Sequence, residues 1–262
     1  MAAKKMVRKL SGTKEWAEHT VNICTGCSHN CRYCYARQYA VKRFSRRESA
    51  DWVREELTQK ASMTKYPARK NPVMFPSTHD ITPNILEDCI RVLRVILAAG
   101  NEVLIVTKPH LAVVERLVKE FVKPDRRDMI EFRFTIGTLS ATLSKFWEPG
   151  APLPSERIAA LKVAYEAGYK TSVSMEPMLG GFDTVSEVMA AVQEYVTETV
   201  WIGKMHRISA VVDMDLRENQ IMVAALKSKQ TDTEILKIYQ MFKDNPMVKW
   251  KNTVVKVLTK YC

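Results

Sequence analysis

Short apolar runs alternate along this chain with longer segments whose apolar residues recur at helical spacing. The short runs are rich in Val, Ile, Thr and aromatic residues, and they predict buried strands at residues 20–23, 72–75, 102–107, 131–136, 170–175 and 199–202. The longer segments predict helices over residues 32–43 with 51–61, 85–99, 111–121, 155–167 and 186–197, and then over 232–243 before a last strand at 253–258. Regular alternation of this kind predicts an α/β fold with a parallel sheet.

The glycine content separates two versions of this fold class. A doubly wound nucleotide-binding sheet carries a glycine-rich phosphate turn after its first strand. The chain has nine glycines and lacks such a turn. It also lacks repeats, low-complexity tracts and linkers, so we expect one domain over residues 1–262, with a core barrel over about 17–205 and a C-terminal extension over about 206–262.

Three cysteines follow the first predicted strand at the spacing Cys-x3-Cys-x2-Cys: Cys27, Cys31 and Cys34. Three thiolates this close can hold three irons of a four-iron cluster and leave the fourth iron open to a small molecule. The aromatic Tyr35 directly follows the third cysteine. With the apolar strand before it, this motif resembles the signature of radical S-adenosylmethionine (SAM) enzymes. The resemblance implies that Cys27, Cys31 and Cys34 ligate a 4Fe-4S cluster and that SAM is the second cofactor.

The resemblance to radical SAM enzymes also implies a fold and a chemistry. The fold is a partial (β/α)6 TIM-like barrel, and the six predicted strand–helix units match it. In that family SAM chelates the open iron, and the reduced cluster cleaves SAM to a 5′-deoxyadenosyl radical. The radical abstracts a hydrogen atom from the substrate, and an external one-electron donor supplies the electron.

Zinc is the alternative metal. With Cys24, the loop also contains two Cys-x2-Cys pairs, which zinc sites favour. Only three residues separate Cys27 from Cys31, whereas zinc ribbons use a longer loop, and Cys24 ends an apolar run where a buried thiol is ordinary. The zinc reading leads to a function of another class, a non-catalytic protein with a metal staple and a basic nucleic-acid surface.

Composition favours a globular protein of a reducing compartment. Hydrophobic residues make up 46% of the chain, which excludes general disorder. The first residues do not resemble a signal peptide, and no segment approaches the length of a membrane span. Six cysteines with a tight cluster in such a chain indicate metal binding in place of disulfides. We therefore expect a cytoplasmic protein without a membrane partner.

The net charge of +11 is concentrated in one part of the chain. Residues 1–70 contain 16 Lys or Arg and 6 Asp or Glu, whereas residues 71–262 contain 24 and 23. Two basic runs, at residues 42–47 and 65–70, each include an aromatic residue. Basic residues with aromatics suit a phosphate backbone and bases that can be stacked. DNA or RNA is therefore the expected partner of this N-terminal quarter, and a merely solvated surface is the alternative.

Polar residues follow the second and third predicted strands, where a barrel gathers its chemistry. Ser77, Thr78 and Asp80 follow the second strand, and their hydroxyls and carboxylate can bind the ammonium and orient the amino acid part of SAM. Lys108 follows the third strand and can pair with the SAM carboxylate. The alternatives are a helix-capping loop for the first group and a lysine that caps a strand end for the second.

The fourth to sixth strands end in further candidates. Thr138 can offer its hydroxyl to SAM or can bond within its own turn. Ser174 and Glu176 follow at the end of the fifth strand, and Lys204 follows the sixth. Glu176 and Lys204 can touch SAM or substrate or can pair with each other, and the sequence does not rank these alternatives.

The ordered pattern as a whole resembles the spore photoproduct lyase family, the DNA repair photolyase-like branch of radical SAM proteins. The resemblance covers residues 20–205 and is carried by the segments 22–27, 31–36, 107–108, 147–152, 156–157 and 166–168. It implies that Ser77, Asp80 and Lys108 contact SAM and that the backbone of Tyr35 lies near the adenine. Tyr33 and Tyr35 are similar to tyrosines of the lyase, one of which is implicated in hydrogen transfer, and they are the candidate catalytic residues.

One departure affects the expected reaction. The lyase has a hydrogen-donating cysteine directly before the serine, where this chain has Pro76. The expectation is therefore a lyase-like radical SAM enzyme that acts on a nucleic acid or nucleotide, without an assignment to thymine-dimer repair. A radical SAM enzyme for a small molecule or peptide is the alternative.

Overall fold

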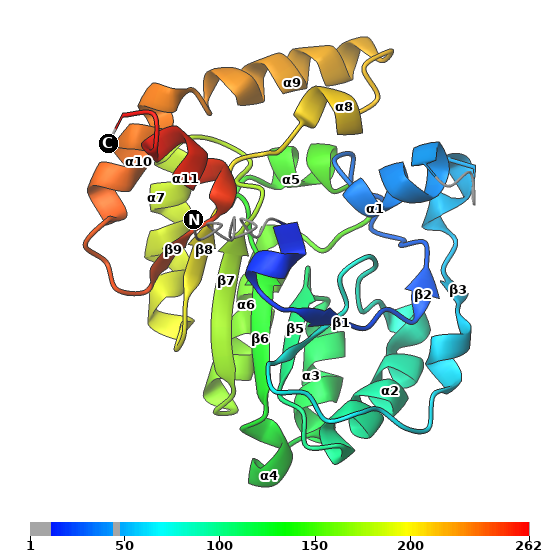
Figure 1. Ribbon diagram of the computed structural model, residues 1–262. Coiled ribbons are helices and arrows are strands. Elements are labelled where there is room, and N and C mark those ends of the chain that lie inside the picture. Colours follow the sequence, from blue (N-terminus) through cyan, green and yellow to red (C-terminus); the bar gives the residue numbers. More distant parts are fainter. Residues whose placement is uncertain (1–11, 44–47, 262) are drawn as a thin grey trace, which may run out of the picture.

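A curled, parallel seven-stranded sheet forms the centre of the structure, a computed structural model that describes residues 12–43 and 48–261 (Figure 1). All neighbouring strands in this sheet are parallel. In spatial order the strands are β1 (His19–Thr20), β4 (Val73–Phe75), β5 (Val103–Thr107), β6 (Ile130–Thr135), β7 (Lys170–Met175), β8 (Val200–Ile202) and β9 (Val248–Trp250). The sheet forms a half-barrel, the partial TIM-like barrel that the sequence predicts.

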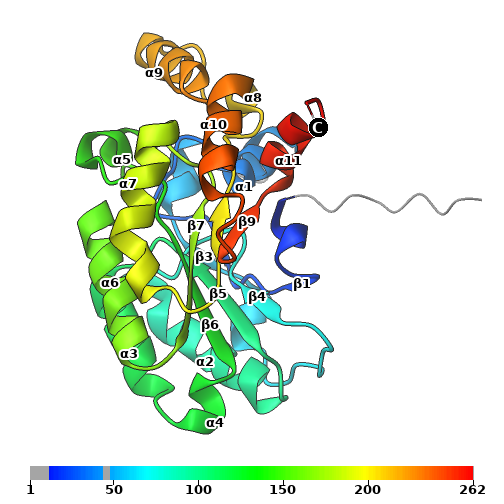
Figure 2. The ribbon, with the colours of Figure 1, turned by 90° about the vertical axis from the view of Figure 1, so that its left-hand side faces the viewer.

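Helices cover the outer face of this half-barrel (Figure 2). They are α2 (Leu86–Ala98), α3 (Leu111–Glu120), α6 (Pro154–Glu166) and α7 (Phe182–Val192), with the short α4 (Pro124–Arg127) before β6. Their apolar faces pack on strand residues such as Ile105, Phe132 and Val173, which are fully buried. Burial of this continuous apolar layer is the main force that holds strands and helices together.

A second layer lies over the carboxyl ends of the strands, at the top of Figure 1. It contains α5 (Ala141–Trp147), α8 (Ile208–Val211) and α9 (Arg217–Ser228), while α10 (Asp232–Phe242) and α11 (Asn252–Leu258) flank β9. A separate apolar cluster joins these helices through Trp147, Ile208 and Leu226. The C-terminal part of the chain therefore completes both the rim and the sheet.

The N-terminal quarter has little regular structure. The short elements are η1 (Gly12–Glu15), β2 (Cys24–Thr25), α1 (Tyr35–Gln38), η2 (Tyr39–Arg43), η3 (Ala50–Val53), β3 (Glu56–Leu57) and η4 (Gln59–Ser62), and later in the chain η5 (Pro83–Ile85) and η6 (Gln193–Tyr195). β2 and β3 pair antiparallel in a ribbon of their own. No helix in the described part of the chain is long and apolar enough to cross a membrane.

Three predicted elements differ from the structure. The helix expected over 51–61 is wrong, because two 3-10 turns flank β3 there. The strand expected over 253–258 is also wrong: this segment is α11, and β9 precedes it. Val254 and Val257, buried three positions apart, fit one face of a helix, but a short run of valines does not separate helix from strand. The first strand is shorter than expected, since β1 ends at Thr20 and β2 pairs with β3.

Candidate functional site

The three cysteines lie in one loop, residues 26–34, which we call the cysteine loop. It connects β2 to α1 and is shaped by left-handed backbone at Gly26 and Asn30, with φ of 95° and 47°. The Cys27 amide donates to the Trp52 carbonyl at 2.8 Å, and the Cys34 amide donates to the Cys31 carbonyl at 3.1 Å. Cys34 also caps α1 through its sulfur. The local backbone therefore holds all three thiols in one compact turn.

Burial governs the protonation of these thiols. It raises the pKa of Cys31 to about 12, although the charge of Lys108 opposes the shift. Burial also raises the pKa of Cys27 and Cys34. None of the three is in a disulfide. A site for thiolates here therefore needs positive charge from a bound metal centre, which stabilises the deprotonated form.

The donor set of the cysteine loop fits an iron–sulfur cluster. Three free thiols are soft ligands suited to iron, and Trp52 and Ala36 pack beside Cys27 and shield it from water. No group of three or more His, Cys, Asp or Glu among the described residues is arranged to hold a single metal ion. Cluster ligands bind different irons, so they do not need to converge on one point.

A buried ion pair lies against the cysteine loop. Arg157 and Glu148 are each 1% exposed, and Arg157 Nη2 lies 2.5 Å from Glu148 Oε2. The Tyr33 hydroxyl donates to the other oxygen of Glu148. Arg157 also donates to the carbonyls of Pro152 and Thr135, at 2.8 and 3.1 Å. Loss of either charge would leave its partner buried without compensation.

Gly150 packs tightly against the cysteine loop. Its amide donates to the His29 carbonyl at 3.0 Å, and a Cβ at this position would lie 2.1 Å from the Ser28 carbonyl oxygen. Only glycine fits such an approach of two backbones. The segment 147–157 thus contacts the cysteine loop from Ser28 to Tyr33.

Asp80 and His29 connect the loop to the next strands. His29 Nδ1 lies 3.2 Å from Asp80 Oδ2, and the backbone amide of Lys108 donates to the same oxygen at 2.9 Å. Burial opposes the charge of Asp80, but His29, then Lys108 and the hydroxyl of Thr107, hold its pKa well below the usual range. Asp80 therefore remains a carboxylate that is occupied by protein partners.

Lys108 lies close to the cysteine loop, to Glu148 and to Asp80. Burial disfavours its charge, yet Cys31, Glu148 and Asp80 raise its pKa above the ordinary value. Its ammonium lies 5.7 Å from the centre of the Tyr33 ring. A partly buried, protonated lysine beside the cysteine loop is suited to bind an anionic group.

Ser77 and Thr78 are fixed by Asn22. The amides of Ser77 and Thr78 donate to Asn22 Oδ1 at 2.6 and 2.9 Å, and Asn22 Nδ2 donates to Ser77 Oγ at 2.9 Å. Tyr35 as a residue is 41% exposed, and its hydroxyl donates to the Ser77 carbonyl. These contacts bring the loop after β4 onto the end of the cysteine loop.

The candidates on the far strands have different partners. Thr138 Oγ1 accepts from the Ser140 amide at 3.1 Å, the local turn bond that was one of its alternatives. The hydroxyl of Ser174 is buried and has no hydrogen-bond partner among the described residues. Glu176 and Lys204 do not pair: Glu176 lies 3.0 Å from the buried Lys251, and Lys204 donates to the Gln230 carbonyl at 3.0 Å.

Several residues of the site cannot be recognised from the sequence alone, because their roles depend on partners that are distant in the chain. Asn22, His29, Glu148 and Arg157 act through contacts that span up to about a hundred residues of chain. The segments 31–36, 147–152 and 156–157 do carry the family resemblance, and the structure shows that 147–152 contacts both of the others. Gly150 is identifiable as a tight approach only when Ser28 is placed against it.

The two basic runs lie in different places. Residues 65–70 lie at the amino ends of the strands, away from the cysteine loop, because Asn101, before β5, accepts from the Arg69 amide and donates to the Pro67 carbonyl. The first run begins at the end of η2, directly after α1, but residues 44–47 lie outside the described residues.

Comparison with known proteins gives a family match. The sequence model of the Radical SAM superfamily matches residues 21–194. The chain is 27% identical over 203 residues to protein ORF301 of Acidianus two-tailed virus, covering 72% of this chain and 64% of that protein. It is 30% identical over 169 residues to protein MJ0683 of Methanocaldococcus jannaschii, covering 62% and 61%. The chain thus spans less than two thirds of these curated relatives.

Among solved structures, the fold is similar to that of spore photoproduct lyase. The TM-score is 0.59 at 13% sequence identity, over 94% of this chain and 79% of that one. At this identity the likeness concerns the fold.

Proposed function

The chain belongs to the radical SAM superfamily, and we propose that it is an enzyme that uses a 4Fe-4S cluster and SAM to abstract a hydrogen atom from a nucleic acid or nucleotide. The observation that carries the proposal is the cysteine loop itself, where three free thiols lie beside the partly buried cation of Lys108. Family membership implies an iron–sulfur cluster and SAM as cofactors.

Cys27, Cys31 and Cys34 would hold the cluster. When bound, the cluster and SAM would supply the electron and the radical that abstracts hydrogen, the hard chemistry of the reaction. The protein supports the loop through Tyr33, Glu148 and the close approach of Gly150. Apolar packing around Cys27 excludes water from the thiols.

Lys108 would pair with the SAM carboxylate, because it keeps its charge at a partly buried position at the strand ends. Ser77, Thr78 and Ser174 would offer hydroxyls, and Ser174 is suited to this because its buried hydroxyl lacks a described partner. Asp80 would act as a positioning residue, since its oxygens already hold the Lys108 amide and His29.

The other four candidates differ in how their polar groups are engaged. Thr138 would have to donate its hydroxyl while it accepts from Ser140. Glu176 would contact SAM while its carboxylate remains paired with the ammonium of Lys251. Both tyrosine hydroxyls are engaged, that of Tyr33 by the Glu148 carboxylate and that of Tyr35 by the Ser77 carbonyl. Tyr35 is the exposed one of the two and would face the substrate, so we favour it for hydrogen transfer.

Two observations support a nucleic acid substrate. The N-terminal quarter carries most of the net charge, and its first basic run, residues 42–47, starts within η2, the helix that follows α1. The similar fold of spore photoproduct lyase has been solved with a dinucleoside spore photoproduct. Phosphate contacts would make binding strongly dependent on salt.

The test is anaerobic reconstitution with iron and sulfide, reduction with dithionite, and addition of SAM with or without DNA or RNA oligonucleotides. We expect 5′-deoxyadenosine, with more product when the oligonucleotide is present. Product that rises with a small anionic metabolite or a peptide, and not with oligonucleotides, would replace the substrate class. A protein that holds zinc without iron and forms no product would be a metal-stapled binding protein.

A further inference from the structure

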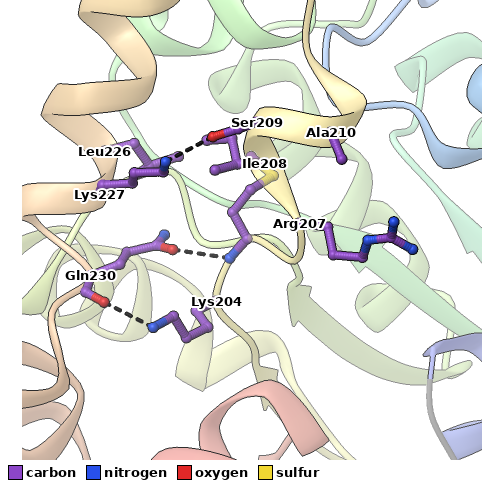
Figure 3. Close-up of a pocket in the computed structure, with 9 residues that line it drawn as sticks. Lys204, Arg207, Ile208, Ser209, Ala210, Leu226, Lys227 and Gln230 are labelled. Atoms are coloured by element: carbon purple, nitrogen blue, oxygen red, sulfur yellow. Dashed lines mark hydrogen bonds between the residues drawn. The ribbon is translucent and has the colours of Figure 1, made fainter.

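A pocket of about 440 Å³ opens beside α8, between the segment that follows β8 and the end of α9 (Figure 3). Three basic side chains line it, Lys204, Arg207 and Lys227, and no Asp or Glu of the described residues does. We propose that this pocket binds a backbone phosphate of the nucleic acid substrate. The inference rests on the proposed function, because it names where that substrate would be held.

The two lysines of the pocket have neutral hydrogen-bond partners in the described part of the chain. Lys204 Nζ donates to the Gln230 carbonyl at 3.0 Å, and Lys227 Nζ donates to Ser209 Oγ at 2.7 Å, as the dashed lines in Figure 3 show. Each ammonium has three donors, so each retains capacity for a ligand. The charge of Lys204 also acts on the Asp232 carboxylate, whose pKa it helps to lower, but no carboxylate lines the pocket, so an anion bound there would gain from the basic residues of the lining.

Arg207 is the most available of the three. Its side chain is exposed and forms no hydrogen bond or ion pair with another described residue. Its backbone is left-handed, with φ of 50° and ψ of 37°, a conformation that costs a side-chain-bearing residue free energy. The Ala210 amide holds this turn by donating to the Arg207 carbonyl at 2.8 Å. Strain of this kind is found where a side chain must be presented in one direction.

The potential around Arg207 is positive. Burial first, and then the charges of Lys256 and Arg207, lower the pKa of the neighbouring His206. In Figure 3 the side chain of Arg207 extends away from Lys204 and Lys227. Its planar guanidinium matches the oxygens of a phosphate, which it can bind through two parallel hydrogen bonds. Met205, Ile208 and Leu226 are buried beneath the cations and would contact the apolar parts of a nucleotide.

The pocket is attached directly to the cysteine loop. Gln38 of α1 donates to the Ala210 carbonyl at 2.6 Å, and Arg32 of the loop lies 3.0 Å from Glu218 of α9. Tyr33 packs on the apolar cluster that contains Met205 and Ile208. A phosphate in the pocket would therefore place the rest of a strand along the rim that carries the cysteines.

The experiment compares wild type with Arg207→Gln and Lys227→Gln, and uses Lys119→Gln as the matched control. Lys119 is an exposed lysine of α3, on the outer face of the barrel. Binding of a fluorescein-labelled single-stranded oligonucleotide is measured by anisotropy over a salt series. Unfolding curves show that each variant is folded.

We expect Arg207→Gln to weaken binding about tenfold at low salt and to lower the slope of log K against log salt by about 0.7, the loss of one phosphate contact. Lys227→Gln should act in the same direction, and Lys119→Gln should bind as wild type does. The weakening should be the same for oligonucleotides of different sequence, because a phosphate carries no base identity.

Three results would overturn the inference in different ways. If wild type binds the oligonucleotide and Arg207→Gln binds it with the same affinity and salt slope, the pocket is not the phosphate site and the substrate class stands. If wild type binds no oligonucleotide, the substrate class itself fails. If inorganic phosphate or a nucleoside monophosphate displaces the probe as well as an unlabelled oligonucleotide does at equal concentration, the natural occupant is a small phosphate compound and not a nucleic acid strand.

Discussion

Charged side chains are buried and paired on one side of the barrel rim, and exposed on the other. On the side of the cysteine loop, Glu148 and Arg157 form an ion pair that is 1% exposed on both partners, and Asp80 holds His29. On the side of α8 and α9, Arg207 and Lys227 are exposed and face neutral groups or solvent. The first side is assembled before any substrate arrives, whereas the second leaves its charge available to a ligand.

This contrast assigns a different task to each side. Paired buried charges fix a loop in position because breaking the pair is costly. Exposed cations without carboxylate partners add little to folding but steer and hold anions. Substitutions on the two sides should therefore affect different measurements.

The largest effect is expected for Cys31→Ala, which removes a thiol from the cysteine loop. SAM cleavage and iron loading should fall to background, while the barrel still unfolds cooperatively, since the loop lies outside the main apolar core. Iron content, 5′-deoxyadenosine and an unfolding curve measure the three properties. Cys89→Ala, in the core of α2, is the control and should keep its iron. Loss of cooperative unfolding in Cys31→Ala would show that the cluster also holds the fold together.

Glu148→Gln should cost about 3–5 kcal/mol of unfolding free energy, because it leaves the Arg157 guanidinium buried without an opposite charge. Urea unfolding of the iron-free protein measures this cost. Glu120→Gln weakens surface ion pairs with Arg116 and Arg94, whose guanidinium groups are solvent-accessible, and should cost about 0–1 kcal/mol. Equal costs for the two variants would contradict the view that the cysteine-loop side depends on buried pairing.

Lys108→Met keeps the volume of the side chain and removes its charge. SAM affinity should fall about tenfold to a hundredfold, the usual value of a hydrogen bond to a charged group, while the iron content stays that of wild type. Equilibrium dialysis with labelled SAM measures the affinity, and Lys119→Met serves as the control. Unchanged affinity would refute the role assigned to Lys108.

His79 predicts a response to pH on the cysteine-loop side. Its Nε2 accepts from the Ile23 amide at 3.0 Å, and burial lowers its pKa, so the folded protein holds the ring neutral. The unfolded chain takes up a proton below about pH 6.5, so stability falls on acidification by at most about 1.4 kcal/mol per pH unit. Unfolding free energies of wild type and His79→Gln between about pH 7.5 and 5.5 test this. The variant should have the flatter profile, and parallel profiles would exclude His79 as the cause.

The smallest effect on stability is expected for Arg207→Gln. The side chain is exposed and has no described partner, so the unfolding free energy should change by no more than about 0.5 kcal/mol. The same variant should lose oligonucleotide affinity, which separates the two sides of the rim in a single protein. A large loss of stability would mean that Arg207 supports the fold.

The parts of the molecule that the sequence predicts well are those with a local signal. Five strands, β4 to β8, lie close to the predicted positions, because short buried apolar runs recur between helical segments. The cysteine loop is recognisable because its three thiols fall within eight residues of chain. The C-terminal segment is harder to predict, since Val254 and Val257 are compatible with a helix or a strand until β9 is seen to pair with β8.

The contacts that organise the site depend on folding. Nothing near Glu176 in the sequence indicates that Lys251 pairs with it in preference to Lys204. The charge of residues 65–70 suggested proximity to the chemistry, but the chain turns and leaves that run at the amino ends of the strands. A basic pocket made by Lys204, Arg207 and Lys227 arises only when the end of α9 returns to β8.

The most direct test of the account is the fate of the hydrogen atom. The reconstituted enzyme would be turned over in ordinary water with SAM and an oligonucleotide deuterated on its sugars and bases, and the 5′-deoxyadenosine would be analysed by mass spectrometry. We predict that deuterium from the oligonucleotide appears in the 5′-deoxyadenosine. Product that forms at the full rate without deuterium would contradict hydrogen abstraction from nucleic acid.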